Sequence, residues 1–185
     1  KYSDDNISGS GVEISLKGAN NGTVEPELSD IFDEGKHVIT FADFKHIKEN
    51  DDLYSLIARV KDKAGNEVEK ELVFSVNRFG SVYVIDEDTQ AIVDGYYTNK
   101  PVEVSVTEIN VDRLTLKEVS IDRNGDISVL KEGKDYSVES EGTDKSWKSF
   151  TYNISSENFR KDGRYSVMVY SEDRAGNKQD NRSEG

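Results

Sequence analysis

Apolar and polar residues alternate along most of this chain with a period of two. In the first third, Val12, Ile14 and Leu16 alternate ahead of the turn-rich stretch "GANNG", and Ile39 and Phe41 repeat the pattern. The rest of the chain carries two more stripes of this kind, namely Val102, Val104 and Val106, then Phe150, Tyr152 and Ile154. Period-two alternation is typical of strands that are buried on one face only. The pattern therefore predicts an all-β chain.

No segment shows the sustained 3.6-residue period of a long amphipathic helix. Three polar segments are each compatible with a single helical turn: "ADFKHIKEN" at 42–50, "DEDTQAIVDG" at 86–95 and "SSENFRKDG" at 155–163. The first and the third of them lie just ahead of a strand that opens with tyrosine. We expect helical structure to be confined to such short connections.

One segment of the sequence occurs twice. Asp51–Asn66 is "DDLYSLIARVKDKAGN" and Asp162–Asn177 is "DGRYSVMVYSEDRAGN", at a constant offset of 111 positions (162 − 51). Tyr-Ser recurs near the start and Asp-x-Ala-Gly-Asn at the end. A self-match without gaps indicates a repeated structural unit. Chance repetition of a common turn is the alternative, but the matched tyrosines, Tyr54 and Tyr165, argue against it.

The end of each copy is predicted to be a β-hairpin. A glycine in the loop can adopt the left-handed conformation that closes a short hairpin. The aspartate at the mouth of the loop can accept hydrogen bonds from turn N–H groups, and the asparagine is interpreted as a turn residue. The residues in question are Asp62, Gly65 and Asn66 in the first copy and Asp173, Gly176 and Asn177 in the second.

A further strand is expected after the first hairpin, because the alternation resumes there. The glutamates at 67, 69 and 71 point to water, and four apolar residues point inward: Val68, Leu72, Phe74 and Val76. Another hairpin is predicted within "VSIDRNGDISVL", because the pair Asn124-Gly125 is strongly favoured in two-residue hairpin loops.

The repeat divides the chain into two units, at residues 1–79 and 80–185. "VTEIN" at Val106–Asn110 also matches "YSDDN" at Tyr2–Asn6, with asparagine on asparagine. In this register the first unit has no counterpart of residues 81–105, so we expect it to lack its first strand. The second unit stops after "KQDNRSEG", where the first continues with "EVEKELVFSVNRFG". We therefore expect its final strand to be truncated.

These features together resemble a known family. A tyrosine that opens the penultimate strand, the Asp-x-Ala-Gly-Asn hairpin and an alternating final strand are similar to the tandem immunoglobulin-like modules of Gram-positive cell-surface proteins and adhesins. The resemblance implies two tandem Ig-like β-sandwich modules with Greek-key connections, in an extracellular, cell-wall-associated setting. It also implies that Tyr54 and Tyr165 form tyrosine corners, in which the hydroxyl bonds back to nearby backbone. The cysteine pair of antibody domains is absent.

The net charge of the chain disfavours some classes of binding partner. The chain has 37 acidic and 24 basic residues, for a formal net charge of −13. The two halves about Gly80 carry −6 (10 − 16) and −7 (14 − 21), so the acidity is a general property of the surface. Nucleic acid and anionic membranes are poor partners for such a field. No apolar run approaches the length of a membrane span.

Nothing in the sequence singles out a catalytic centre. The two histidines, His37 and His46, both lie in the first unit, and there is no cysteine. No nucleophile elbow, phosphate-binding loop or HExxH motif is present. Carboxylates are plentiful, but no pair stands out as an acid and a base. We predict that the chain is not an enzyme.

Two acidic clusters are candidates for structural calcium. The first is Asp4, Asp5 and Asn6, and the second is Asp86, Glu87 and Asp88 near the junction of the two units. Calcium takes six to eight oxygen ligands from such groups. The alternative is that acidic loops are ordinary in a chain of this charge, and no EF-hand spacing is present. No other cofactor is expected.

Three aromatic residues are candidates for ligand contact. Tyr96 and Tyr97 lie in the loop "DGYYTNKP", and Trp147 lies in "GTDKSWKSF". Exposed aromatic rings stack on sugar rings or anchor protein partners. Packing of the same rings into the core or the junction is the favoured alternative.

The sequence is best interpreted as a non-catalytic module pair that serves as a spacer or adhesive stalk. Its expected partners are neighbouring modules of the same chain. The alternative is that one module binds a host ligand directly, either a glycan or a protein such as a secreted immunoglobulin. An exposed aromatic patch would favour that alternative, whereas a uniformly charged surface would favour the spacer.

Overall fold

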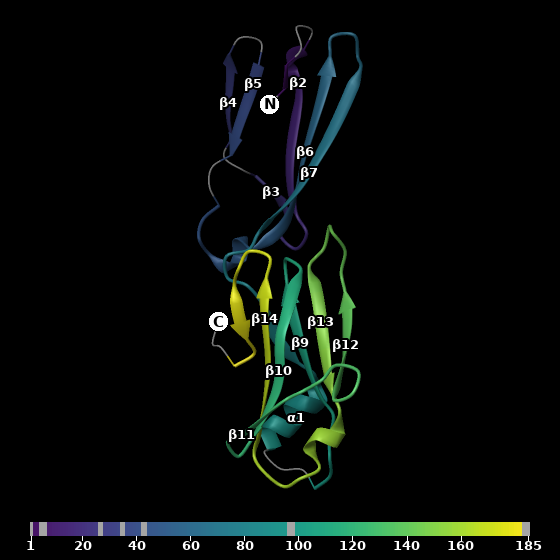
Figure 1. Ribbon diagram of the computed structural model, residues 1–185. Coiled ribbons are helices and arrows are strands. Elements are labelled where there is room, and N and C mark those ends of the chain that lie inside the picture. The colour runs from purple at the N-terminus through teal and green to yellow at the C-terminus, as the bar shows by residue number, and fades with distance from the viewer. Residues whose placement is uncertain are drawn as a thin grey trace. The chain divides into compact units, whose positions relative to one another are not determined.

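The computed structural model describes residues 2–3, 7–25, 28–33, 36–41, 44–95 and 99–182 (Figure 1). The chain forms two compact units, Lys1–Val76 and Asn77–Gly185. Most of the described residues lie in antiparallel strands, with one α-helix and two short 3-10 helices among them. The predicted all-β character is confirmed at this level. The sequence has no cysteine, so each unit is stabilised by its own packing and hydrogen bonds and not by disulfides.

The first unit contains two sheets. The four-stranded sheet has the order β3-β2-β6-β7, and the three-stranded sheet has the order β1-β5-β4. Its elements are β1 (Tyr2–Ser3), β2 (Ile7–Gly18), β3 (Gly22–Val24), β4 (Leu28–Asp33), β5 (Lys36–Phe41), η1 (Lys48–Asn50), β6 (Asp52–Asp62) and β7 (Glu67–Val76).

An aromatic cluster fills the described core of the first unit. Leu16 of β2 faces Leu56 of β6 in an antiparallel ladder, and Leu16 is buried. The Tyr54 ring is also buried, with its centroid 5.7 Å from that of Phe74 and 4.7 Å from that of Phe44. Aromatic pairs at such separations add to the stabilisation from burial alone. Leu16, Tyr54 and Phe74 therefore lie on faces that the period-two pattern predicts to be inward, whereas Phe44 was not expected in this core.

The inward face that we expected for β7 is covered only in part. Phe74 and Val76 are half-buried, but Val68 and Leu72 are 57% and 59% exposed. Alternation decides which side chains share a face of a strand. Whether that face is buried depends on a second layer, which the strand's own sequence does not supply. The prediction that Val68 and Leu72 are core residues is wrong.

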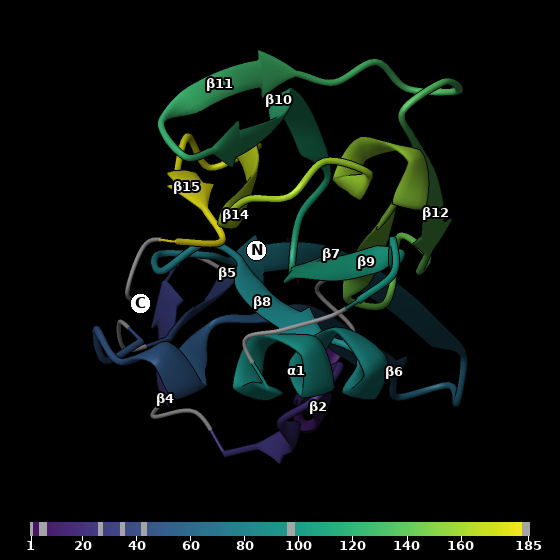
Figure 2. The same cartoon turned by 90° about the horizontal axis from the view of Figure 1, so that it is seen from below.

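The second unit contains two four-stranded sheets. Their orders are β12-β13-β9-β8 and β11-β10-β14-β15. The elements are β8 (Val82–Ile85), α1 (Glu87–Gly95), β9 (Val104–Asn110), β10 (Leu114–Arg123), β11 (Asp126–Val129), β12 (Tyr136–Glu141), β13 (Lys148–Ile154), η2 (Ser156–Phe159), β14 (Tyr165–Asp173) and β15 (Lys178–Asp180). Figure 2 shows the two sheets of this unit as separate layers.

The core of the second unit lies between these two layers. One sheet contributes Val106, Tyr136, Tyr152 and Ile154, and the other contributes Val119, Ile121 and Val169. All seven side chains are at most 7% exposed and form one hydrophobic cluster. Two sheets that bury one face each against the other make a β-sandwich-like unit.

The predicted hairpins occur where the sequence places them. The strands β10 and β11 meet at Asn124-Gly125, whose φ angles are 55° and 94°. Both positive angles are those that a type I′ loop requires. The 3-10 helices η1 and η2 end shortly before β6 and β14, the two strands that carry the repeated Tyr-Ser pair.

The helical segment expected at residues 86–95 is longer than the single turn that we predicted. The helix α1 has nine residues and contacts β9. Asp86 caps its start, because the Asp86 carboxylate accepts from the Thr89 N–H at 2.7 Å and the Asp86 carbonyl accepts from the Gln90 N–H at 2.9 Å. The cap satisfies an N–H group that has no partner within the helix. The hydrogen bonds from Thr89 lower the pKa of Asp86.

Candidate functional site in the second unit

The repeated hairpin has the same hydrogen bonds in both units. The Asp62 N–H donates to Asn66 O at 2.9 Å, and the Asp62 carboxylate accepts from the Asn66 N–H (2.8 Å) and Nδ2 (2.7 Å). Asp173 and Asn177 repeat these three bonds at 3.0, 2.9 and 2.8 Å. The loop glycine has a φ of 92° in the first unit and 91° in the second. One local sequence thus builds one local structure twice.

The two repeated tyrosines also make equivalent bonds. The Tyr54 hydroxyl donates to Asn50 O at 3.0 Å, and the Tyr165 hydroxyl donates to Lys161 O at 2.6 Å. In both cases the acceptor lies four residues upstream, which is the bond of a tyrosine corner. The rings differ in burial, because Tyr54 is 1% exposed whereas Tyr165 is only half-buried.

Asp173 differs from Asp62 in its surroundings. Asp173 is 6% exposed, and its Oδ2 also accepts from Asn77 Nδ2 at 2.9 Å and from Asn110 Nδ2 at 3.3 Å. Asn77 precedes β8, and Asn110 ends β9, so three distant segments meet at this carboxylate. Burying a carboxylate is costly unless hydrogen bonds replace the lost water. These amides supply those bonds.

A second buried carboxylate lies beside the first. Glu108 of β9 is fully buried, and its Oε1 accepts from Ser81 Oγ at 2.6 Å and from the Tyr83 hydroxyl at 3.0 Å. The Ser171 hydroxyl also donates to this oxygen, and the Tyr152 hydroxyl lies 3.4 Å from Oε2. In the described part of the chain, the side chains that donate to Glu108 are therefore hydroxyls from both sheets and from Ser81, which directly precedes β8.

Sequence reasoning missed Glu108, although a signal for it exists. Val106, Glu108 and Asn110 alternate along β9, so all three share the face on which Val106 enters the core. A glutamate on the same face of a strand as a core valine indicates either a buried polar group or the end of the strand. The hydroxyls that satisfy it come from 25 to 63 positions away in the sequence. No local sequence pattern predicts that these hydroxyls bond to Glu108.

The tyrosines beside Glu108 are expected to make the stability of the second unit depend on pH in the alkaline range. Burial, and then the charge of Glu108, raises the pKa of Tyr83 and of Tyr152 well above the ordinary value. A group whose pKa is raised by folding stabilises the fold fully below its unfolded pKa, which for tyrosine is about 10. That stabilisation is lost as the pH rises through the folded pKa. We therefore expect the unfolding free energy of the second unit to fall above about pH 10.

The experiment is a series of denaturant titrations at rising pH, followed by the fluorescence of Trp147. This is the only tryptophan of the chain and lies in the second unit. Tyr83→Phe should make the alkaline loss shallower, because it removes one of the three tyrosines of this unit whose pKa is raised, namely Tyr83, Tyr136 and Tyr152. An equally steep loss in Tyr83→Phe would contradict the assignment.

Gln179 of β15 ties the end of the second unit to its beginning. Its Nε2 donates to Phe79 O at 2.7 Å, and its Oε1 accepts from the Ser81 N–H. Gly80, between them, has a φ of 73°, and a Cβ at this position would collide with the Gln179 carboxamide. Glycine is therefore required here both for its conformation and for the space that it leaves.

The second cluster of candidate calcium ligands lies at the start of helix α1. Asp86 caps α1, and Glu87 and Asp88 form the first turn of that helix with exposed side chains. Asp4, Asp5 and Asn6 lie outside the described residues. In the parts of the chain that the structure describes, no three histidine, aspartate or glutamate side chains are grouped to hold a metal ion. Calcium stays a sequence-based prediction.

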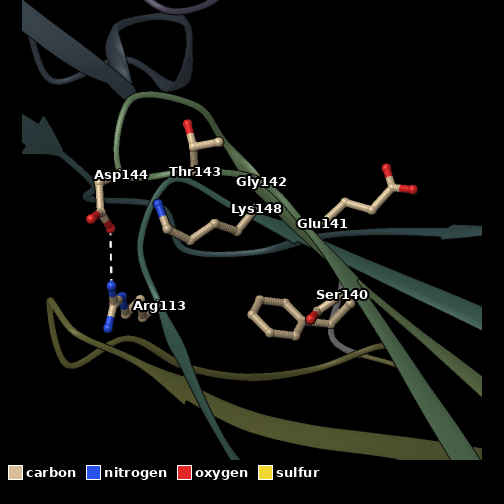
Figure 3. Close-up of a pocket in the computed structure, with 8 residues that line it drawn as sticks. Arg113, Ser140, Glu141, Gly142, Thr143, Asp144 and Lys148 are labelled. Atoms are coloured by element: carbon tan, nitrogen blue, oxygen red, sulfur yellow. Dashed lines mark hydrogen bonds and ion pairs between the residues drawn. The ribbon is translucent and has the colours of Figure 1, made fainter.

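An open surface hollow of about 500 Å³ lies over the end of β12 and the start of β13. Figure 3 shows Arg113 and Asp144 facing each other across it, with an ion-pair distance of 3.0 Å, while Glu141 points away. Lys148 Nζ donates to Val111 O at 3.3 Å and to Ser146 O at 3.2 Å. Phe150 gives the hollow an aromatic wall.

Only one of the candidate aromatic contacts can be placed. Trp147 lies in the loop beside this hollow and is half-buried, and its carbonyl packs against Gly142, which has a φ of 111°. Tyr96 and Tyr97 lie outside the described residues. Trp147 itself does not line the hollow, whereas its lining residues include Arg113 and Phe150, which sequence reasoning did not select.

No helix in the described ranges is long and apolar enough to cross a membrane. Comparisons of the chain with protein-family models and with curated proteins find no match.

Proposed function

We propose that this chain is a non-catalytic pair of Ig-like modules that acts as a load-bearing spacer, or adhesive stalk, of a bacterial surface protein. The extracellular, cell-wall-associated setting rests on the resemblance of the repeated tyrosine strand and hairpin to such modules. The observation that carries the mechanical role is the set of hydrogen bonds that joins the first and last segments of the second unit.

The strand order supports the Ig-like assignment. In the second unit, β8, β9, β13 and β12 correspond to strands A, B, E and D of an immunoglobulin sandwich, and β15, β14, β10 and β11 correspond to G, F, C and C′. The chain changes sheet between β9 and β10, between β11 and β12, and between β13 and β14. Crossings between sheets of this kind are expected of Greek-key connections and so support the proposal.

The same assignment extends to the first unit. Its sheets β1-β5-β4 and β3-β2-β6-β7 follow the orders B-E-D and C′-C-F-G. The ladders agree as well, because Ile7 faces Asp62 beyond a bulge in β2, just as Leu114 faces Asp173 beyond a bulge in β10. A strand corresponding to β8 is not among those described in the first unit.

The geometry of the second unit suits the transmission of force. Asn177 Nδ2 donates to Asn77 O at 3.3 Å, and Gln179 bonds to Phe79 and Ser81, so residues 77–81 and 177–179 run side by side in the same direction. Pulling the unit from its two ends draws these segments in opposite directions. All of the cross-bonds are then loaded together and do not open one at a time. The acidic surface keeps an array of such units soluble.

The test is single-molecule stretching of the full chain. Gln179→Met keeps the volume of the side chain but removes both cross-bonds, at a cost of about 2 kcal/mol for two hydrogen bonds. We expect a lower unfolding force for the second unit and an unchanged force for the first. Lys178→Ala, at an exposed neighbouring position, is the matched control. An unchanged unfolding force of the second unit in Gln179→Met would contradict the mechanical role.

The hollow beside Trp147 supports a second candidate function, the direct binding of a ligand. Phe150 offers an aromatic face, and Arg113 offers a cation whose partner Asp144 is solvent-exposed. A glycan or a secreted immunoglobulin that docks here would change the fluorescence of Trp147. Titration with immunoglobulin and a glycan array, each repeated with Arg113→Ala, would test this candidate. A response that Arg113→Ala leaves intact would place the ligand elsewhere.

A further inference from the structure

The two repeated hairpins have the same internal hydrogen bonds, but they differ in their exposure to solvent. The bonds between Asp62 and Asn66 are exposed to solvent, whereas Asp173 is 6% exposed. The difference does not lie in the loop sequence, which is Asp-x-Ala-Gly-Asn in both units. It therefore lies in what packs against the loop.

In the second unit the covering group is the entry segment, residues 77–81. Asn77 Nδ2 donates to the Asp173 carboxylate at 2.9 Å, and Asn77 O accepts from Asn177 Nδ2 at 3.3 Å. The segment then passes Gln179, where Gly80 leaves room for the carboxamide, and continues into β8, which pairs with β9. One stretch of chain thus caps the hairpin and adds a strand to the opposite sheet.

The first unit has the equivalents of the hairpin and of the strand that contact residues 77–81 in the second unit. Its β1 matches β9 in the sequence register and pairs with β5 among the described strands. The offset of 111 that relates the hairpins places Val68 where the second unit has Gln179, and the Val68 side chain is 57% exposed. An exposed valine therefore follows an uncovered hairpin at the position where the second unit buries its entry segment.

We propose that the Asp62–Asn66 hairpin of the first unit is a docking site for an extended polypeptide segment with the chemistry of residues 77–81. Such a segment has an asparagine that reaches the hairpin carboxylate and a glycine that lets the backbone pass close to the strand. The occupant that we propose is a segment covalently joined to the start of the first unit, as residues 77–81 are joined to the second. The proposal rests on the proposed function, because such a segment would connect one module of an array to the next. Val68 gives this docking an apolar contact in place of the hydrogen bonds of Gln179.

The test adds the segment to the full chain in the register that the sequence defines. Since Val106 matches Tyr2, a copy of residues 77–104 is placed directly ahead of Lys1. The tether gives the added segment a high effective concentration, so weak docking becomes measurable. The readout is hydrogen exchange of the backbone N–H groups of Gly65 and Asn66, which bond to Asp62 in the hairpin.

We expect exchange at these two amides to slow by about tenfold or more in the extended chain, because a covered hairpin opens less often. The same extension with alanine in place of the copied Asn77 should lose most of this protection. A copy with residues 77–81 in scrambled order should give none. Equal exchange in the extended and the original chains would overturn the proposal.

Two further outcomes are informative. Protection that appears only as the concentration of the original chain rises would make a second copy of the chain the occupant and would also overturn the proposal. Failure here is distinct from failure of the mechanical role, since exchange at Gly65 and Asn66 reports on the first unit. The stretching of Gln179→Met reports on the second unit.

Discussion

Glu108→Ala is expected to lower the unfolding free energy of the second unit by about 4 kcal/mol. Glu108 is fully buried, and its carboxylate is the acceptor for the hydroxyls of Ser81, Tyr83 and Ser171. Alanine removes that acceptor and leaves a cavity. Each buried hydroxyl without a partner costs about 1–3 kcal/mol, partly relieved where it can turn to another group or to water.

Two variants separate the contributions. Glu108→Gln keeps the volume and one acceptor oxygen, so we expect a smaller loss of about 1–2 kcal/mol. Glu139→Ala, on an exposed position of β12, should change stability by less than about 0.5 kcal/mol. Denaturant titrations followed by Trp147 fluorescence measure all three. If Glu108→Ala were no more destabilising than Glu139→Ala, the polar network would contribute nothing to stability.

Asp173→Ala is expected to destabilise the second unit by about 3 kcal/mol, whereas Asp62→Ala should cost the first unit about 1 kcal/mol. Both substitutions remove the same hairpin bonds to an asparagine. Asp173→Ala also leaves the buried amides of Asn77 and Asn110 without this acceptor. In the first unit, water can replace the lost carboxylate because the hairpin is exposed.

The chain therefore contains its own control, with one turn in two environments. Trp147 fluorescence follows the second unit, and hydrogen exchange in β6 follows the first. Equal losses in the two units would mean that the burial of Asp173 adds nothing beyond the turn. A larger loss in the first unit would reverse the assignment of the buried network.

The local elements of this fold are largely contained in the sequence. The Asp-x-Ala-Gly-Asn loops, the Asn124-Gly125 hairpin and the helical turns ahead of Tyr54 and Tyr165 all depend on bonds between residues a few positions apart. Backbone conformation and near-neighbour hydrogen bonds decide such structures, so a short word in the sequence is sufficient. Only the helix α1 is longer than expected. Its few apolar residues lie among acidic and polar ones, so the sequence shows no clear helical period.

The sequence by itself determined most of the strands, the hairpin turns and the faces that alternate along those strands, but it did not reveal β4 or β12. The tertiary structure decided which of those faces are covered. Val68 and Leu72 have the alternation of core residues but remain exposed, while Glu108 and Asp173 are charged and yet buried. Burial is set by segments that arrive from far along the chain, and the donors that make a buried carboxylate tolerable arrive with them. For this reason the hairpin was predictable from five residues, whereas the network that buries one copy of it was not.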